Sequence, residues 1–323
     1  MKLAFVLPGG GACGRWQIGV LKYLYDMGVF PKINLVCGTS VGGLNTLMVG
    51  KYLNNFQAAV DLWSNIKSNK DVFNGMLQFN SFWDYVGMAS QIFKTNQGKS
   101  ILDPVGLYHL LDTNFGNMQL KDLLVPIIIT TTDMSTGERL TFDSTKNPLY
   151  KCADLGKCTS AIPLAFPAYP EYVNNQLDLC VDGGLGRNVP IDCAISAGST
   201  HIILIGTSPD AFPREEITNN VLSIAMRIED IVMHAFEEDC WNSKENYEEK
   251  SKLNSVIYPP IKILDIYPQE STGSALNFSN VEQFAAGYNY AKDNLPQEVL
   301  TAFLSSIICP PSDRLTASGG VIS

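Results

Sequence analysis

Two strand–turn–helix patterns follow each other within the first fifty residues. Residues 3–7 form an apolar run that leads through the glycine-rich stretch 8–14 into apolar residues at helical spacing. Residues 33–37 form a second apolar run, which enters another helical pattern through the pentapeptide 38–42, GTSVG. Strands joined by crossover helices lie parallel, so both turns should meet at the sheet edge where α/β proteins bind ligands. This predicts an α/β fold with a mainly parallel central sheet and a functional site at that edge.

The rest of the chain continues with further strand and helix patterns and shows no repeats. The stretch 150–170 is rich in small residues and prolines, and no regular element is predicted there. No composition shift marks an internal boundary, so we expect one domain over residues 1–309 and a flexible tail over 310–323. Strands are predicted at 125–131, 139–142, 177–181, 201–206 and 261–266, and helices at 104–111, 188–197, 217–236, 281–289 and 297–304.

Ser40 is the candidate nucleophile of the pentapeptide 38–42, which has the pattern G-x-S-x-G. The two glycines let a sharp strand-to-helix turn close without clashes and leave the hydroxyl exposed. At a helix N-terminus, free N–H groups and the helix dipole favour developing negative charge. The pentapeptide alone also fits an ordinary turn, so catalysis requires a base and an oxyanion site nearby.

The glycine-rich stretch has two interpretations. The pattern of Gly9, Gly11 and Gly14 matches the dinucleotide fingerprint, which also requires an acidic residue at the end of the second strand. That strand ends in Cys37 and Gly38 instead, which argues against a nicotinamide or flavin site. The backbone N–H groups of residues 9–14 are therefore interpreted as donors for an oxyanion.

Asp182 is the candidate base. It leaves the apolar strand 177–181 for a Gly-Gly turn, where partial burial would raise its pKa above the usual value of about 3.9. A turn-capping aspartate is the alternative. The chain has three histidines, of which His201 should begin a strand and His234 should lie within a helix, positions that suit packing better than catalysis. The third, His109, precedes Asp182, against the usual Ser, acid, His order.

Charge and cysteine content narrow the class of protein. The 23 basic and 32 acidic residues give a net charge of −9, which argues against nucleic-acid binding and against steering to strongly anionic lipid surfaces. The eight cysteines include no C-x-x-C pair and several lie in apolar stretches, so we expect free thiols in a reducing compartment.

No apolar stretch is long enough for a membrane span or a signal-peptide core. We expect a cytoplasmic protein that meets membranes only from outside.

Three motifs in order, GGGACG at 9–14, GTSVG at 38–42 and DGG at 182–184, resemble those of the patatin-like phospholipase family. The likeness extends to about residue 291. The flanking stretches that agree with the family are QIGVL at 17–21, TDMSTGE at 132–138, SAIP at 160–163 and RNVP at 187–190. The resemblance implies a three-layer α/β/α patatin-like fold and lipid acyl hydrolysis by a Ser-Asp dyad. In such a dyad Ser40 attacks the acyl ester, Asp182 accepts its proton, and the N–H groups of Gly10 and Gly11 hold the oxyanion. The family needs no metal or organic cofactor.

The same resemblance implies a phospholipid or lysophospholipid substrate and transient contact with a membrane or micelle. An acyltransferase, a general esterase or a thioesterase would carry the same motifs, and so would a catalytically silent lipid-binding regulator. Many family members place a basic residue where this chain has Cys13, and Arg15 would point elsewhere if the helix has begun. The sequence does not determine the substrate's headgroup, acyl position or chain length. It also does not determine the oligomeric state or the need for an activator.

An aromatic stretch at 71–93 has no assigned role in these motifs. It contains Phe82 and Trp83 among other aromatic and apolar residues. Most such stretches are core, here under a helical excursion. The functional interpretation is a lid or a surface that faces the acyl chain.

Overall fold

The computed structural model describes residues 2–75, 100–209, 227, 231 and 245–305, apart from 256 and 259. Its centre is an eight-stranded sheet with the order β5-β6-β3-β2-β1-β7-β8, and β4 pairs with β3 outside this path. The strands are β1 (Leu3–Leu7), β2 (Ile33–Thr39), β3 (Ile127–Asp133), β4 (Arg139–Asp143), β5 (Tyr169–Val173), β6 (Gln176–Asp182), β7 (His201–Ile205) and β8 (Lys262–Ile266).

The five strands β3, β2, β1, β7 and β8 run parallel, whereas β4, β5 and β6 join the sheet in antiparallel pairs. Strand β1 lies at the middle of the parallel part and is buried along its whole length. A strand covered on both faces needs apolar residues at every position, which explains why its sequence does not alternate.

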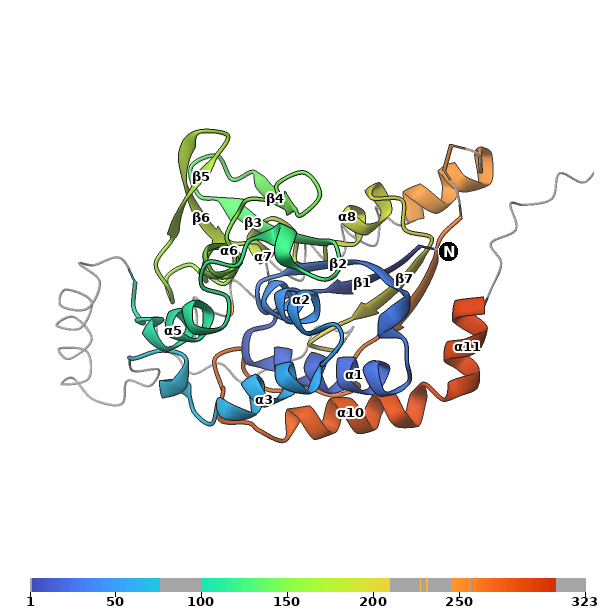
Figure 1. Ribbon diagram of the computed structural model, residues 1–323, viewed down its shortest axis with the longest axis horizontal. Coiled ribbons are helices and arrows are strands. Elements are labelled where there is room, and N and C mark those ends of the chain that lie inside the picture. Colours follow the sequence, from blue (N-terminus) through green and yellow to red (C-terminus); the bar gives the residue numbers. More distant parts are fainter. Residues whose placement is uncertain are drawn as a thin grey trace, which may run out of the picture.

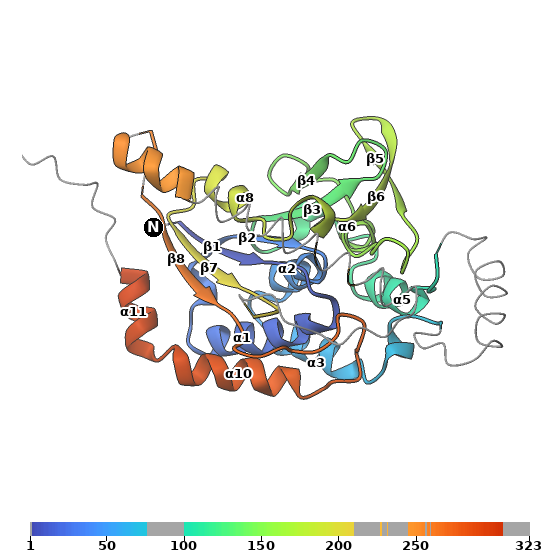
Figure 2. The same ribbon diagram turned by 180° about the vertical axis from the view of Figure 1, so that it is seen from behind.

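Helices cover both faces of this sheet (Figures 1 and 2). From β1, Leu3, Phe5 and Leu7 pack into one hydrophobic cluster with the helices α1, α2 and α10. Ala4 and Val6 pack into a second cluster with α8 on the opposite face. The fold is therefore a three-layer α/β/α sandwich, as the sequence predicts. The helices are α1 (Gly14–Asp26), α2 (Val41–Tyr52), α3 (Gln57–Asn65), α5 (Val105–Asn114), α6 (Cys152–Thr159), α7 (Gly184–Arg187), α8 (Ile191–Ser196), α10 (Gln283–Asn294) and α11 (Gln297–Ser305).

Two regular elements lie in the stretch where the sequence predicted none. Helix α6 occupies residues 152–159, and β5 begins at Tyr169. Strand β5 forms an antiparallel hairpin with β6 through Asn174 and Asn175, whose φ angles are 51° and 67°. Asparagine tolerates this left-handed conformation, which tight hairpin turns need. Pro170 fits because β5 is the edge strand of the sheet.

Several predictions fall outside the described residues. They concern the aromatic residues beyond position 75, including Phe82 and Trp83, the helix at 217–236 apart from residues 227 and 231, and the tail at 310–323. Within the described ranges, six cysteines are free thiols and all are buried. Among the helices that the structure describes, none has the length and apolar character needed to span a bilayer.

Candidate active site

Ser40 lies in the sharp turn between β2 and α2. Its φ of 54° and ψ of −131° form a strained conformation for a residue with a side chain, as expected for a nucleophile at such a turn. The turn packs tightly, because a Cβ on Gly42 would run into the carbonyl of Leu7. The backbone N–H of Ser40 donates to Thr159 Oγ1 at 2.8 Å. This hydrogen bond helps to hold the strained turn in place.

Asp182 ends β6 and meets Ser40 at the edge of the sheet. Strand β6 pairs Asp182 with Thr131 of β3, and β3 in turn pairs with β2, so the sheet brings the two residues together. Ser40 Oγ donates to Asp182 Oδ2 at 2.5 Å, and the N–H of Gly184 donates to Asp182 Oδ1 at 2.8 Å. Asp182 is fully buried. Loss of solvation raises its pKa to about 7, although both hydrogen bonds act in the opposite direction.

The glycine loop, residues 9–14, lies against this pair. Both backbone polar groups of Gly9 are hydrogen-bonded. Its N–H donates to Asn188 Oδ1 at 2.9 Å, and its carbonyl accepts from Thr207 Oγ1 at 2.6 Å. The N–H of Ala12 donates to the carbonyl of Ala275 at 2.7 Å. Neither Gly10 nor Gly11 donates its N–H to an acceptor within the described part of the chain. Within the described residues, the loop thus offers two N–H donors beside Ser40 that have no acceptor.

Cys13 and Arg15 show how the loop is held without a basic residue at position 13. Cys13 is buried and its thiol donates to the carbonyl of Gly273 at 3.3 Å. Arg15 is buried in α1, where it donates to the carbonyl of Ile66 at 2.6 Å and lies 5.7 Å from the centre of the Trp63 ring. The segment around Gly273 therefore supports the loop, while Arg15 supports the helix next to it.

Neither of the two histidines that the structure describes is placed to serve Ser40. His201 begins β7, where it pairs with Leu3 at the start of β1, whereas Ser40 follows the end of β2. The parallel strands therefore put His201 and Ser40 at opposite edges of the sheet. His109 is exposed on α5, and His234 lies outside the described residues.

The supporting residues Thr159, Asn188 and Thr207 carry no assigned role in the sequence analysis. Asn188 lies in the RNVP stretch that contributed to the family resemblance, so its motif was visible although its contact was not. Thr159 ends α6, the helix that the sequence analysis did not predict. Thr207 follows the end of β7. Their importance depends on contacts with residues 119 to 198 positions away in the chain, which local sequence patterns do not report.

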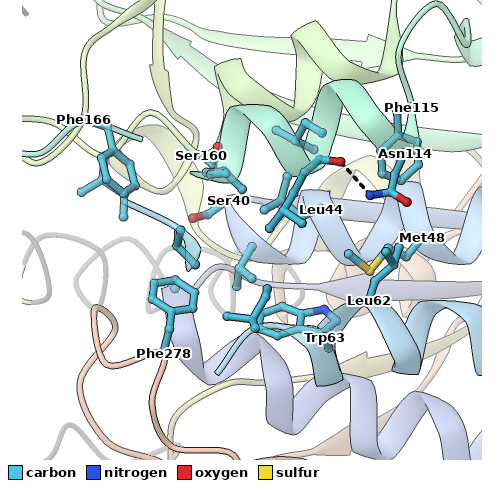
Figure 3. Close-up of a pocket in the computed structure, with 18 residues that line it drawn as sticks. Ser40, Leu44, Met48, Leu62, Trp63, Asn114, Phe115, Ser160, Phe166 and Phe278 are labelled. Carbon is cyan, nitrogen blue, oxygen red and sulfur yellow. Dashed lines mark hydrogen bonds between the residues drawn. The ribbon is translucent and has the colours of Figure 1, made fainter. Parts of the chain in front are cut away.

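An apolar pocket opens from Ser40 (Figure 3). Its walls come mainly from α2, α3 and α5, and its cavity volume is about 70 Å³. Gly11 of the glycine loop lines the same pocket as Ser40. Among the described residues, no group of three or more His, Cys, Asp or Glu side chains is arranged to hold a metal ion. The arrangement can perform nucleophilic attack on a carbonyl group that carries an apolar chain.

A family model and several curated proteins match more than half of this chain. A family model described as patatin-like phospholipase matches residues 5–195. Patatin-like phospholipase domain-containing protein 7 of Mus musculus is 25% identical over 203 residues, and patatin-like protein 2 of Oryza sativa subsp. indica is 28% identical over 231 residues. Each alignment covers 63% of this chain, but 13% of the Mus musculus protein and 54% of the Oryza sativa protein. The chain thus spans only part of the length of these relatives.

One solved structure that this chain matches is human GIVD cytosolic phospholipase A2 in complex with methyl gamma-linolenyl fluorophosphonate. It is 12% identical, with a TM-score of 0.47, over 94% of this chain and 59% of that chain. The match of the family model extends over more than half of the chain and includes the glycine loop, Ser40 and Asp182. The chain therefore belongs to the patatin-like phospholipase family, a family of hydrolases that act on carboxylic esters.

Proposed function

We propose that this chain is a serine lipid acyl hydrolase in which Ser40 is the nucleophile and Asp182 the general base. The observation that carries the proposal is the 2.5 Å hydrogen bond from Ser40 Oγ to the buried Asp182 Oδ2. A carboxylate with a pKa near 7 is a better proton acceptor than an ordinary aspartate and is still ionised at neutral pH in a large share of molecules.

The reaction would proceed through an acyl-enzyme. Ser40 Oγ bonds to the acyl carbon while its proton moves to Asp182, and the former carbonyl oxygen becomes an oxyanion near the N–H groups of Gly10 and Gly11. Collapse of this intermediate expels the alcohol, which takes the proton from Asp182. Water then attacks the acyl-enzyme and gives a proton to Asp182. That proton returns to Ser40 as the fatty acid leaves.

A phospholipid or lysophospholipid is the substrate class that we propose, at a membrane or micelle surface. The support is the apolar lining of the pocket at Ser40, together with the phospholipase names of the relatives. We further propose that residues 1–309 form one domain, because the sheet spans residues 3–266 and α10 packs on α1 from beyond the family match.

The test is release of fatty acid from mixed phospholipid and lysophospholipid vesicles. Wild type is compared with Ser40→Ala and Asp182→Asn, and with the matched changes Ser64→Ala and Asp61→Asn at exposed positions of α3. We expect both site variants to lose at least 100-fold in rate and the two controls to keep it. A fluorophosphonate probe should label wild type but not Ser40→Ala.

The other outcomes separate the alternatives. Activity that survives in Asp182→Asn but not in Ser40→Ala would reject Asp182 as the base. A new ester formed when an alcohol acceptor is added would indicate acyl transfer. A folded wild type that neither reacts with the probe nor releases fatty acid would favour a silent lipid-binding protein.

A further inference from the structure

The apolar pocket follows α2 for two helical turns. Ser40 is the N-cap of this helix, and Leu44 and Met48 line the pocket at successive steps of four residues. With a rise of about 1.5 Å per residue, Met48 lies about 12 Å along the helix from Ser40. Figure 3 shows the same order, with Ser40 on one side, Leu44 in the middle and Met48 on the far side. The pocket therefore has a direction and a measurable length.

The side walls of the pocket are held firmly. Trp63 is buried and its Nε1–H donates to Asn45 Oδ1 at 2.9 Å, which fixes the indole ring. Behind that ring, Arg15 donates to the carbonyls of Ile66 and Phe278, two further lining residues. These contacts tie α1 and α2 to the walls formed by the end of α3 and the segment before α10. A wall with this many directed contacts has little freedom to widen for a thicker ligand.

The far end of the pocket is formed by Met48, Leu62 and Asn114. Asn114 Nδ2 donates to the carbonyl of Leu110 at 2.8 Å. Lys51, three residues beyond Met48, places its ammonium on the carbonyl of Asn114. A methyl terminus that passed Met48 would exclude water from the Asn114 amide and the Lys51 ammonium. The alkyl chain offers these groups no hydrogen bond in exchange, so this step is unfavourable. The physical boundary for an alkyl chain is therefore near Met48.

We propose that this pocket holds one acyl chain of medium length, and that Met48 sets the upper limit. The proposal rests on the proposed function, because it takes Ser40 as the point where the ester is held. An extended chain of single bonds advances about 1.2 Å per bond, as a polypeptide does at about 3.3–3.6 Å per three bonds. About 12 Å thus accommodates about ten carbons. Longer chains must displace the side chain of Met48. This side chain is flexible, and substituting it breaks no hydrogen bond.

The test is the dependence of kcat/KM on acyl length for saturated p-nitrophenyl esters from acetyl to palmitoyl, in one fixed non-ionic detergent. Each methylene buried in the pocket should raise kcat/KM by up to about fourfold until the chain reaches Met48. We expect a maximum near the decanoyl ester and at least a tenfold fall by the palmitoyl ester. A plateau from decanoyl to palmitoyl in wild type would overturn the proposal.

Substitution at Met48 tests the residue itself. Met48→Ala should move the maximum to longer esters, and Met48→Trp should move it to shorter ones. A melting curve for each variant checks that it folds as wild type does. Met134→Ala, at a residue that is 63% exposed and does not line the pocket, should leave the profile unchanged. An unshifted maximum in both Met48 variants would reject Met48 as the limit.

A binding measurement separates failure of this proposal from failure of the proposed function. Wild type is titrated with saturated fatty acids of the same lengths in competition with a fluorescent fatty acid. If the protein hydrolyses no ester but binds medium-length acids best, with the same shifts in the Met48 variants, the pocket assignment stands and the enzyme assignment falls. Affinity that rises steadily to palmitate would overturn the length limit whether or not the protein is an enzyme.

Discussion

The hydroxyl of Thr159 accepts the backbone N–H of Ser40 at 2.8 Å and donates its own proton to the carbonyl of Thr130 at 2.7 Å. Thr159 is fully buried at the end of α6, and Thr130 belongs to β3 next to the serine turn. One hydroxyl therefore links the strained residue to the central sheet. A backbone conformation with positive φ persists only when its surroundings hold it, and this hydrogen bond is one such restraint.

Replacing Thr159 with Val should lower kcat while KM changes little. The change keeps the shape but leaves the N–H of Ser40 and the carbonyl of Thr130 without their partner, which costs about 1–3 kcal/mol and corresponds to about 5–150-fold. Thr159→Ser should restore most of the rate because it keeps the hydroxyl. Steady-state kinetics on a soluble ester and a melting curve for each variant provide the check. Equal rates in wild type and Thr159→Val would show that the turn needs no such restraint.

The rate should depend on pH through Asp182. Burial raises its pKa to about 7, so below that pH the carboxyl is protonated and cannot accept the proton of Ser40. We expect kcat/KM to fall about tenfold for each pH unit below about 7 and to level off above it. A pH profile on a soluble ester measures this. A flat profile from about pH 5 to about pH 8 would contradict a raised pKa at the base.

Stability should show the opposite dependence on pH. The folded-state pKa of about 7 exceeds the value of about 3.9 in the unfolded chain, so the unfolded state loses its proton first as pH rises. The stabilisation from protonated Asp182 is complete below about pH 3.9 and is lost as pH rises through about 7, a change on the order of 4 kcal/mol. Asp182→Asn removes this loss, so the variant should melt at a higher temperature than wild type at pH 8 and should lose that advantage toward pH 4. Thermal melts of both proteins across this range decide the point, and a constant difference would refute it.

Gly11 should tolerate no side chain. Its φ of 54° lies in the left-handed region, and a Cβ there would run into the carbonyl of Ala275. Gly11→Ala should therefore shift the loop and cost at least 100-fold in rate if its N–H holds the oxyanion. Gly28→Ala is the matched control, because Gly28 also has a positive φ but a Cβ there meets nothing within 4 Å. Full activity in Gly11→Ala would exclude this loop as the oxyanion site.

Local patterns predicted those parts of the fold that depend on local sequence. The apolar runs at the parallel strands and the glycines around Ser40 were recognisable because burial on both faces and a sharp turn leave direct compositional traces. Helix α6 was overlooked because it is only eight residues long and contains Gly156 and Thr159, which are weak helix formers. The hairpin turn at Asn174 and Asn175 did leave a signal, which the prediction overlooked.

The site was predictable only in part, for the same physical reason. The motifs named Ser40, Asp182 and the glycine loop, and the structure brings these three together, while their catalytic roles stay predictions. Thr159, Asn188 and Thr207 act through single hydrogen bonds across the sheet. Such a bond depends on which distant elements become neighbours, and a threonine or asparagine with that contact looks like any other in the sequence.

The hydrogen bond from Ala12 to Ala275 means that the glycine loop is supported by a segment made late in synthesis. At roughly 5–20 residues per second, a ribosome delivers Asp182 several seconds before it delivers Ala275. During that interval a nascent chain has both members of the dyad but not the support of the loop beside them. Under the proposed function, the order of translation thus delays lipid cleavage until the sheet has received β8.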